Sequence, residues 1–271
     1  DYSSLSSFIN ALNYVHRHLD WRDTLDWLGR EPFWIMEEKG EMQGVLACPP
    51  EPEDVAWVRL FGSTMRASPD RVWKKLFAPC LETLREMKPV PLVTTLALRD
   101  WYEELIRRNG FEHYQDIVVF VFDEEPPAPP RIGPEFRLRE MQVKDLHDVC
   151  ELDHLAFEPI WRLSSDDLLF AAKKSSLCTI IEYNNQVIAY QMSSTSGMYA
   201  HLARLAVHPN MQHQRLGFAL VQNLLDYFLR QKRLWGVTLN TQNTNSASIN
   251  LYRKAGFRET GERFPVFQYL E

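Results

Sequence analysis

Residues 201–232, HLARLAVHPNMQHQRLGFALVQNLLDYFLRQK, decide the fold of this chain. The stretch begins with an alternating apolar run, which is typical of a strand, and Pro209-Asn210 ends that run with turn chemistry. Apolar residues then recur at helical spacing, at Leu216, Leu220, Leu224, Tyr227 and Phe228. We therefore predict a strand, a polar turn and a helix. The N-terminus of such a helix offers unpaired N–H groups and the positive end of a dipole, which suit a phosphate group.

A second motif follows at residues 240–257, NTQNTNSASINLYRKAGF. Thr244 or Asn245 can cap a helix there, and Gly256 can supply the left-handed residue that ends it. Between them, Ala247, Leu251 and Ala255 fall on one helical face, which we expect to be buried. The first motif alone is also compatible with an ordinary strand–turn–helix unit that has a tight turn at Gly217.

Together the two motifs resemble the GNAT acetyltransferase superfamily. Its members carry Val-x-Pro and then Gln/Arg-x-x-Gly-x-Gly/Ala at the start of a helix. A later segment reads Asn-x-x-(Ala/Ser)-x-x-Leu-Tyr-x-x-x-Gly-Phe. Laid without a gap from Val207, the first pattern places Gln212 at its Gln/Arg, Arg215 at its first glycine and Gly217 at its second.

A shift of two residues instead gives Gln214-x-x-Gly217-x-Ala219. We prefer the ungapped register, because residues 219–221 then also fall where the family has Ala-Leu-Val. Arg215 departs from the pattern in that register. It either adds a positive charge near a pyrophosphate or narrows the loop.

The resemblance implies acetyl-CoA (CoA) as cofactor. The strand backbone at Leu205, Ala206 and Val207 would then bind the acetyl carbonyl and the pantetheine arm. The loop and helix start would hold the pyrophosphate, through Gln212, His213, Gln214, Arg215, Leu216, Gly217, Phe218 and Ala219. Asn245 corresponds to an asparagine that contacts the cofactor arm. Tyr252 corresponds to the usual general acid near the sulfur; the alternative is an aromatic side chain of the core.

The general base is less clearly indicated. The branch that resembles ribosomal-protein N-acetyltransferases has a glutamate twelve residues before the tyrosine, but this chain has Asn240 there, which takes no proton at neutral pH. The arylalkylamine-type branch resembles this chain around His201 and places a base on that strand. His201 is therefore our first candidate, with a half-exposed strand histidine as the alternative, and Glu158 is the reserve.

Two aromatic residues follow the helix predicted at residues 143–155. The family's acceptor loop usually lies there, so Phe157 and Trp161 are expected to line the acceptor groove. The alternative is that both belong to the core.

The chain also contains an internal repeat. LIRRNGF at residues 105–111 matches LYRKAGF at 251–257, an offset of 146 residues, and WVRL at 57–60 matches LARL at 202–205. Such self-similarity indicates a duplicated domain. The first copy has Ala67–Lys74 in place of the glycine turn and Ile106 in place of Tyr252, so it is expected to be degenerate.

We therefore predict an α/β (α+β) protein of two tandem GNAT-like domains, each a mixed, mostly antiparallel twisted sheet flanked by helices. Residues 1–123 would form the copy without the cofactor motif, 124–134 a proline-rich linker, and 135–271 the acetyl-CoA-binding domain. Within the first copy, the spacing predicts two short helices over residues 3–28 and one strand over 56–61.

Composition excludes some classes of protein. The net charge of −6 disfavours nucleic acid and anionic membranes as partners. The four scattered cysteines contain no CxxC pair, which favours reduced thiols in the cytoplasm over disulfides or a zinc site. His201, His208 and His213 lack a carboxylate or thiol to complete a metal site, so none is predicted.

The predicted function is an acetyl-CoA-dependent N-acetyltransferase. A primary amine of a small molecule or peptide would attack directly in a ternary complex, at one active site in the C-terminal half. The alternative is a catalytically silent acyl-CoA-binding or scaffold protein. The identity of the amine and the oligomeric state are not indicated by the sequence.

Overall fold

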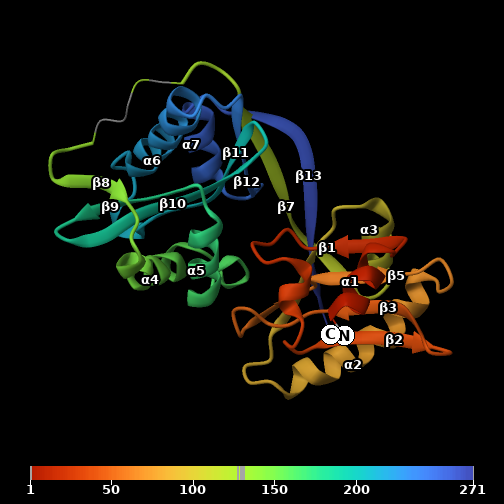
Figure 1. Ribbon diagram of the computed structural model, residues 1–271. Helices are drawn as coiled ribbons and strands as arrows, with labels where there is room; N and C mark the ends of the chain where they lie inside the picture. The colour runs from red at the N-terminus through yellow and green to blue at the C-terminus, as the bar shows by residue number, and fades with distance from the viewer. Residues whose placement is uncertain (1, 127, 129–131, 271) are drawn as a thin grey trace. The chain divides into compact units, whose positions relative to one another are not determined.

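The computed structural model describes residues 2–126, 128 and 132–270 (Figure 1). It contains two compact units: unit 1 is Asp1–Gln115 with Phe264–Glu271, and unit 2 is Asp116–Arg263. These boundaries differ from those predicted at 123 and 135, because strands β7 (Phe111–Phe122) and β13 (Arg258–Tyr269) each run from one unit into the other. Residues 127 and 129–131 of the predicted linker lie outside the described part of the chain.

Unit 1 combines strands with three helices and a short 3-10 turn among its described residues. In chain order these are α1 (Tyr2–Asn10), β1 (Tyr14–Arg17), η1 (Thr24–Trp27), β2 (Phe33–Glu38), β3 (Glu41–Ala47), β4 (Val55–Trp57), β5 (Leu60–Ser63), α2 (Pro69–Glu86), β6 (Leu92–Leu96) and α3 (Asp100–Arg107). Strands β1, β5, β3 and β2 are antiparallel neighbours in that order. Strand β6 pairs with β4 in parallel and with the end of β13 in antiparallel.

Two predictions for unit 1 are wrong in detail. Residues 14–17 form a strand rather than a helix, paired from Tyr14↔Ser63 to Arg17↔Leu60. The apolar spacing there is compatible with either structure, and pairing with β5 decides it. The strand predicted over 56–61 is interrupted between Trp57 and Leu60.

Unit 2 contains the stretch that decides the fold. Its elements after β7 are β8 (Phe136–Glu140), η2 (Val143–Asp145), α4 (Leu146–Ala156), η3 (Pro159–Trp161), α5 (Ser165–Lys174), β9 (Leu177–Tyr183), β10 (Gln186–Ser196), β11 (Tyr199–Val207), η4 (Pro209–Met211), α6 (Leu216–Leu225), the π-helical turn η5 (Asp226–Gln231), β12 (Gly236–Gln242) and α7 (Ser246–Lys254). The strand order is β7-β12-β11-β10-β9-β8. Strands β11 and β12 are parallel because α6 connects them by a crossover, and the other neighbours are antiparallel.

Helices cover both faces of the unit 2 sheet, with α4 and α5 on one side and α6 and α7 on the other (Figure 1). On the second side, α6 buries Leu216, Ala219 and Leu220 against β9 and β10. Further along the same helix, Val221 and Leu224 pack in a cluster that also contains Tyr252. The helical spacing predicted from Leu216 therefore marks the buried face.

The predicted fold class is confirmed, since each unit has a mostly antiparallel mixed sheet flanked by helices. The two copies of the sequence repeat also share a backbone feature. Gly110 after α3 and Gly256 after α7 both have a positive φ, +86° and +96°, as expected for glycines that end helices.

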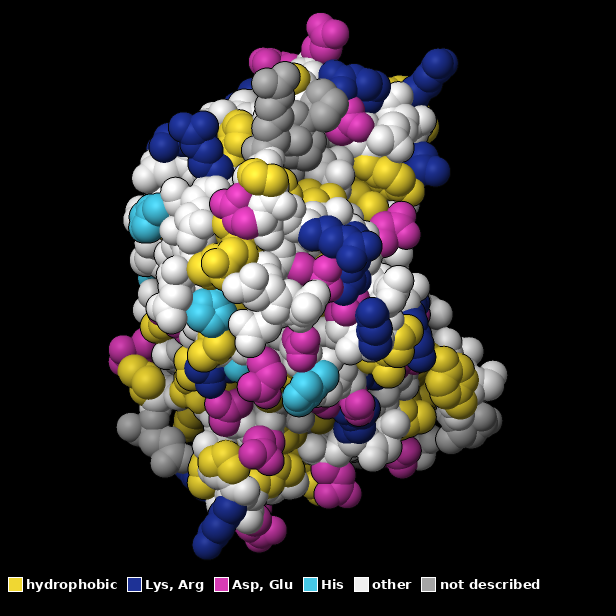
Figure 2. Space-filling model, turned by 90° about the vertical axis from the view of Figure 1, so that its left-hand side faces the viewer, with side chains coloured by type: hydrophobic (Ala, Val, Ile, Leu, Met, Phe, Trp, Pro, Cys, Tyr) yellow, Lys and Arg dark blue, Asp and Glu magenta, His cyan; other side chains and the backbone are white. Residues whose placement is uncertain are grey.

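Two surface features bear on partners. Lysine and arginine side chains are interspersed with aspartate and glutamate on the face seen in Figure 2, so no extended area of one sign covers the described residues there. Among the described helices, none combines the length and the apolar character needed to cross a bilayer.

Candidate active site

Strands β11 and β12 are paired only over their first halves. Their parallel register runs from Tyr199↔Gly236 to Leu202↔Leu239 and stops there, although both strands continue. The stop coincides with a β-bulge, because Ala203 has no partner in the register between β10 and β11. Beyond the bulge the facing edges of the two strands are not paired with each other, and we call this unpaired stretch the gap.

The register with β10 shows which backbone groups of β11 face this gap. Antiparallel partners alternate between hydrogen-bonded and non-bonded pairs. The N–H of His208 donates to the carbonyl of Ile188 at 2.8 Å, so the next bonded pair is Tyr190↔Ala206. Ala206 therefore directs its N–H and C=O toward β10.

Leu205 and Val207 lie on either side of Ala206. Their backbone N–H and C=O groups point away from β10, into the gap. Of the three strand positions predicted to bind the cofactor, two thus offer backbone groups to a ligand and Ala206 offers none. The sequence motif does not distinguish these positions, because the distinction comes from the register.

The turn before α6 has an unusual backbone. His213 and Arg215 have φ values of 64° and 62°, in the left-handed region, and residues 212–215 are all exposed. Arg215 occupies the position where the ungapped pattern has its first glycine, and its positive φ supports that register. The conformation disfavours an arginine by about 1–2 kcal/mol.

The N-terminus of α6 is open. Its N-cap residue, Arg215, makes no side-chain capping bond, and the first turn carries no acidic residue. The first helical bond runs from the N–H of Ala219 to the carbonyl of Arg215 at 2.9 Å. The N–H groups of residues 216–218 therefore lack helical partners and suit an anion. Gly217 allows close packing of this end against α7, since a Cβ there would lie 3.1 Å from Cδ2 of Leu251.

The corresponding helix of unit 1, α2, has a closed N-terminus. Pro69 at its start has no N–H, and the hydroxyl of Ser68 accepts from the N–H of Arg71 at 3.4 Å. Asp70 adds a negative charge in the first turn. These three features disfavour a phosphate in unit 1.

Tyr252 lies on α7 and is 5% exposed. Its ring packs near those of Phe120 and Phe257, with centroids 6.3 and 6.0 Å away. Burial raises the pKa of Tyr252 to about 12, although a hydrogen bond with the Ser248 side chain acts in the opposite direction. The phenol is consequently protonated at neutral pH and is able to donate.

Asn245 is the N-cap of α7. Its Oδ1 accepts from the N–H of Ser248 at 3.1 Å, and its Nδ2 donates to Oε1 of Gln242 at 3.4 Å. The predicted cap is thus confirmed. The predicted contact between Asn245 and the cofactor arm remains a prediction.

His201 lies on β11 at the closed end of the gap, just before the last paired residues. Its Nδ1 is 2.9 Å from Oγ1 of Thr238, whose hydroxyl donates to the carbonyl of Ala200 at 3.3 Å. Because that hydroxyl has one proton, it accepts from Nδ1–H, which leaves Nε2 deprotonated. Burial lowers the pKa of His201, so the neutral form predominates at neutral pH.

The predicted acceptor residues lie between α4 and α5. Phe157 is the C-cap residue of α4, and the guanidinium carbon of Arg204 lies 3.6 Å from the centre of the Phe157 ring. The carbonyl of Trp161 accepts a hydrogen bond from the same guanidinium. Glu158 is the N-cap residue of the 3-10 turn η3 and is exposed. The structure thus brings Phe157 and Trp161 next to the bulge, whereas Arg204 was not among the predicted site residues.

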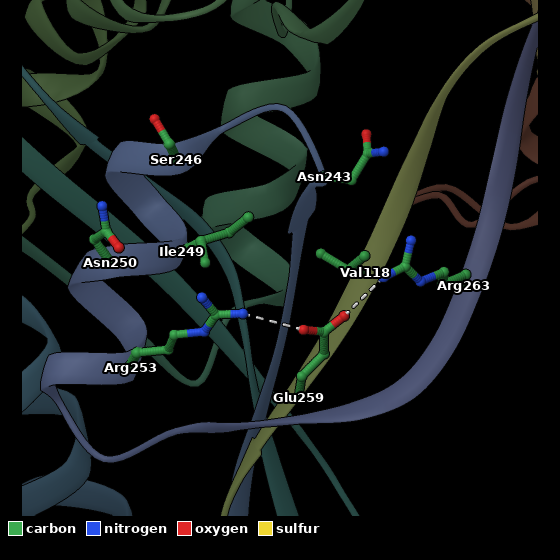
Figure 3. A pocket seen from close by; sticks show the side chains of 8 residues that line it. All are labelled: Val118, Asn243, Ser246, Ile249, Asn250, Arg253, Glu259 and Arg263. Carbon is green, nitrogen blue, oxygen red and sulfur yellow. Dashed lines mark hydrogen bonds and ion pairs between the residues drawn. The ribbon is translucent and has the colours of Figure 1, made fainter.

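A separate pocket lies beside α7 (Figure 3). Its volume is about 310 Å³, and it is lined by Val118, Asn243, Ser246, Ile249, Asn250, Arg253, Glu259 and Arg263. Glu259 accepts from Arg253 at 3.4 Å and from Arg263 at 3.3 Å, so a carboxylate of the chain itself offsets both charges. None of the predicted site residues lines this pocket. Among the described residues, no cluster of three His, Cys, Asp or Glu side chains is placed to hold a metal ion.

Residues 146–257 match the acetyltransferase (GNAT) family. Three solved structures share the fold. A GCN5-related N-acetyltransferase from Sphaerobacter thermophilus has a TM-score of 0.61 and 14% identity, over 90% of this chain and 82% of that one. A tandem GNAT protein from the clavulanic acid biosynthesis pathway has a TM-score of 0.61 and 16% identity, over 88% and 83%. A GCN5-related N-acetyltransferase from Anabaena variabilis has a TM-score of 0.63 and 12% identity, over 90% and 64%.

Proposed function

We propose that unit 2 transfers an acetyl group from acetyl-CoA to a primary amine, on the premise that residues 146–257 match the acetyltransferase (GNAT) family. The observation that carries the proposal is the gap between β11 and β12, which ends at the open N-terminus of α6. One region thus offers backbone groups for an amide-containing arm and N–H groups for a pyrophosphate.

Each part of this region would hold a different part of the cofactor. Leu205 and Val207 would bind the acetyl and pantetheine groups through their backbone, and the turn at residues 212–215 with the first turn of α6 would hold the pyrophosphate. Arg215 would add a positive charge there. When bound, the thioester supplies an acyl carbon that is activated toward an amine.

The residues of the chain would then stabilise charge and move protons. The N–H of Leu205 faces the gap and would donate to the acetyl oxygen as it gains charge, an effect of about 3–4 kcal/mol for a well-placed donor. His201 Nε2 would take one proton from the bound ammonium group and pass it to solvent, so that the neutral amine attacks. Tyr252 would donate a hydrogen bond to the leaving sulfur. In the net reaction a C–N bond forms, the C–S bond breaks, one proton of the ammonium group goes to solvent and a second ends on the thiol.

The pKa of about 12 refines the role of Tyr252. A thiol has a pKa of about 8.5, so complete proton transfer from the phenol would be unfavourable by roughly 5 kcal/mol. Tyr252 would therefore act mainly by donating a hydrogen bond to the developing thiolate.

The simplest test of this function is thiol release from acetyl-CoA. The purified chain should release CoA thiol faster with a panel containing a glycine-initial peptide, a lysine peptide, kanamycin, spermidine and tryptamine than without amine. If CoA binds but no amine accelerates thiol release, the chain is instead a silent acyl-CoA-binding protein.

We predict that His201→Gln removes an acid limb from the pH profile of kcat/KM. A base must be neutral, so the rate should fall as the pH drops through the pKa of His201. Burial places that pKa below the ordinary value of about 6.5, and the limb should lie below that pH in the unsubstituted chain. The variant should be slower by about 10²-fold or more at neutral pH.

The matched control is His147→Gln, which changes an exposed histidine on α4. It should keep both the rate and the acid limb. If His201→Gln keeps them as well, the base is another group, and Glu158→Gln becomes the next variant to measure.

A further inference from the structure

Arg204 is the centre of a buried polar cluster on the face of the unit 2 sheet that α4 covers. Its side chain is 11% exposed and that of its partner Asp153 is 0% exposed. Nε of Arg204 donates to Oδ2 of Asp153 at 2.7 Å, and Nη2 lies 2.6 Å from the same oxygen. The hydroxyl of Tyr190, also fully buried, donates to Oδ2 as well.

The same cluster holds the loop between α4 and α5, residues 157–163. Arg204 donates to the carbonyl of Trp161 and lies against the ring of Phe157. Asp153 accepts from the N–H of Leu163 at 3.0 Å through its other oxygen. Arg204 therefore contacts the loop directly at Phe157 and Trp161 and is linked to its end at Leu163 through Asp153, and Arg204 immediately precedes Leu205.

A buried ion pair adds little net stability compared with well-packed apolar side chains. Arg204 also emerges at the bulge, where the strand departs from regular pairing. We therefore explain the Arg204–Asp153 ion pair by its effect on the geometry of the loop and the bulge, rather than by a contribution to stability.

Unit 1 contains the same arrangement. Arg59 lies in the interruption between β4 and β5, 145 residues before Arg204. It donates to Oδ2 of Asp20 at 2.8 Å and to the carbonyl of Glu51 at 3.0 Å, and its guanidinium carbon is 4.4 Å from the centre of the Trp27 ring. A carboxylate, a backbone carbonyl and an aromatic ring surround the arginine in both units.

The two copies differ in what lies beside them. Next to Arg204 are the gap and the open N-terminus of α6, whereas the helix of unit 1 has a closed N-terminus. The arginine of unit 1 thus provides an internal reference for the contribution of this cluster to folding alone.

We propose that Arg204 is a positioning residue for the acceptor amine, which it serves by holding the loop at residues 157–163 against the bulge of β11. The proposal rests on the function proposed above. Phe157 and Trp161 form the wall along which the amine approaches, and Arg204 fixes that wall relative to the backbone N–H of Leu205. The residue does not itself contact the reacting atoms.

The test compares Arg204→Lys with Arg59→Lys in the full chain. Lysine keeps the charge and loses the planar fork that contacts Asp153, Trp161 and Phe157 together. With the best amine of the panel as acceptor, Arg204→Lys should raise the KM for that amine at least about tenfold and change the KM for acetyl-CoA less than twofold. Arg59→Lys should leave both KM values unchanged, even where it lowers Tm equally.

Hydrogen exchange provides a readout that does not depend on activity. Residues 157–163 should exchange faster in Arg204→Lys than in the unsubstituted chain, and they should be unaffected in Arg59→Lys. Tyr190→Phe removes one hydrogen bond of the cluster and keeps its shape, so it should give a smaller change in the same direction. This variant keeps the test decisive if Arg204→Lys folds poorly.

The outcomes separate the two proposals. Faster exchange at residues 157–163 in a chain that transfers no acetyl group would overturn the proposed function and leave the structural link between Arg204 and the loop intact. Acetyl transfer with an unchanged amine KM in both Arg204→Lys and Tyr190→Phe would overturn the positioning role. The positioning role would also be overturned if Arg59→Lys changed the KM for the amine and the KM for acetyl-CoA by the same factors as Arg204→Lys does.

Discussion

Tyr252→Phe should lower kcat by about 10²–10³-fold, which corresponds to roughly 3–4 kcal/mol of transition-state stabilisation. Burial raises the pKa of the phenol to about 12, so it stays protonated well above neutral pH, and its hydroxyl would be the donor to the leaving sulfur. Phenylalanine keeps the ring that packs near Phe120 and Phe257 but removes that donor. The affinity for CoA should change little.

Steady-state kinetics with the best amine of the panel, together with calorimetric titration of CoA, would measure both effects. Tyr227→Phe is the matched control, since it removes a phenolic hydroxyl from the same unit at a residue that is half-buried on η5. An unchanged kcat in Tyr252→Phe would show that Tyr252 is a core aromatic, the alternative that its 5% exposure also allows.

Local sequence patterns predicted the helix starts and turns of unit 2 well. The apolar spacing from Leu216, the cap at Asn245 and the positive φ of Gly256 all have counterparts in the structure. These features depend on residues close together in the chain, so periodicity and turn chemistry are sufficient to indicate them.

Features that depend on distant pairing were not predictable in the same way. Residues 14–17 became a strand because β5 lies beside them, about 45 residues later in the chain. The predicted domain boundaries differ from the compact units because β7 and β13 pass from one unit into the other. Neither fact is visible in a window of ten to twenty residues.

In the candidate site, too, local features were predictable from the sequence and features that depend on distant pairing were not. The glycine motif indicated the turn at residues 212–217, but only the register showed that Leu205 and Val207, rather than Ala206, face the gap. Arg204 was missed even though a signal existed. An arginine interrupts an apolar run in both copies of the repeat, at residues 59 and 204, and a charge that occurs twice within an apolar run indicates a buried partner.

Gly217→Glu should abolish measurable CoA binding, and the unsubstituted chain should bind one CoA. Of the two corresponding helices, α6 has an open N-terminus, whereas Ser68, Pro69 and Asp70 close that of α2. A glutamate in the first turn of α6 would place a carboxylate near the pyrophosphate. Two like charges about 4 Å apart repel by about 4 kcal/mol at a protein surface, or roughly 10³-fold in Kd.

Calorimetric titration gives both the stoichiometry and the affinity. Gly217→Ala is the matched control, since it adds only the Cβ, 3.1 Å from Cδ2 of Leu251, where a shift of a few tenths of an ångström relieves the contact. It should weaken CoA binding far less than the glutamate does. Two sites of equal affinity in the unsubstituted chain, or CoA binding retained in Gly217→Glu, would contradict a single site at α6. The chemistry of the helix starts argues for the single site, because phosphate needs free N–H groups and only one of the two helices leaves them free.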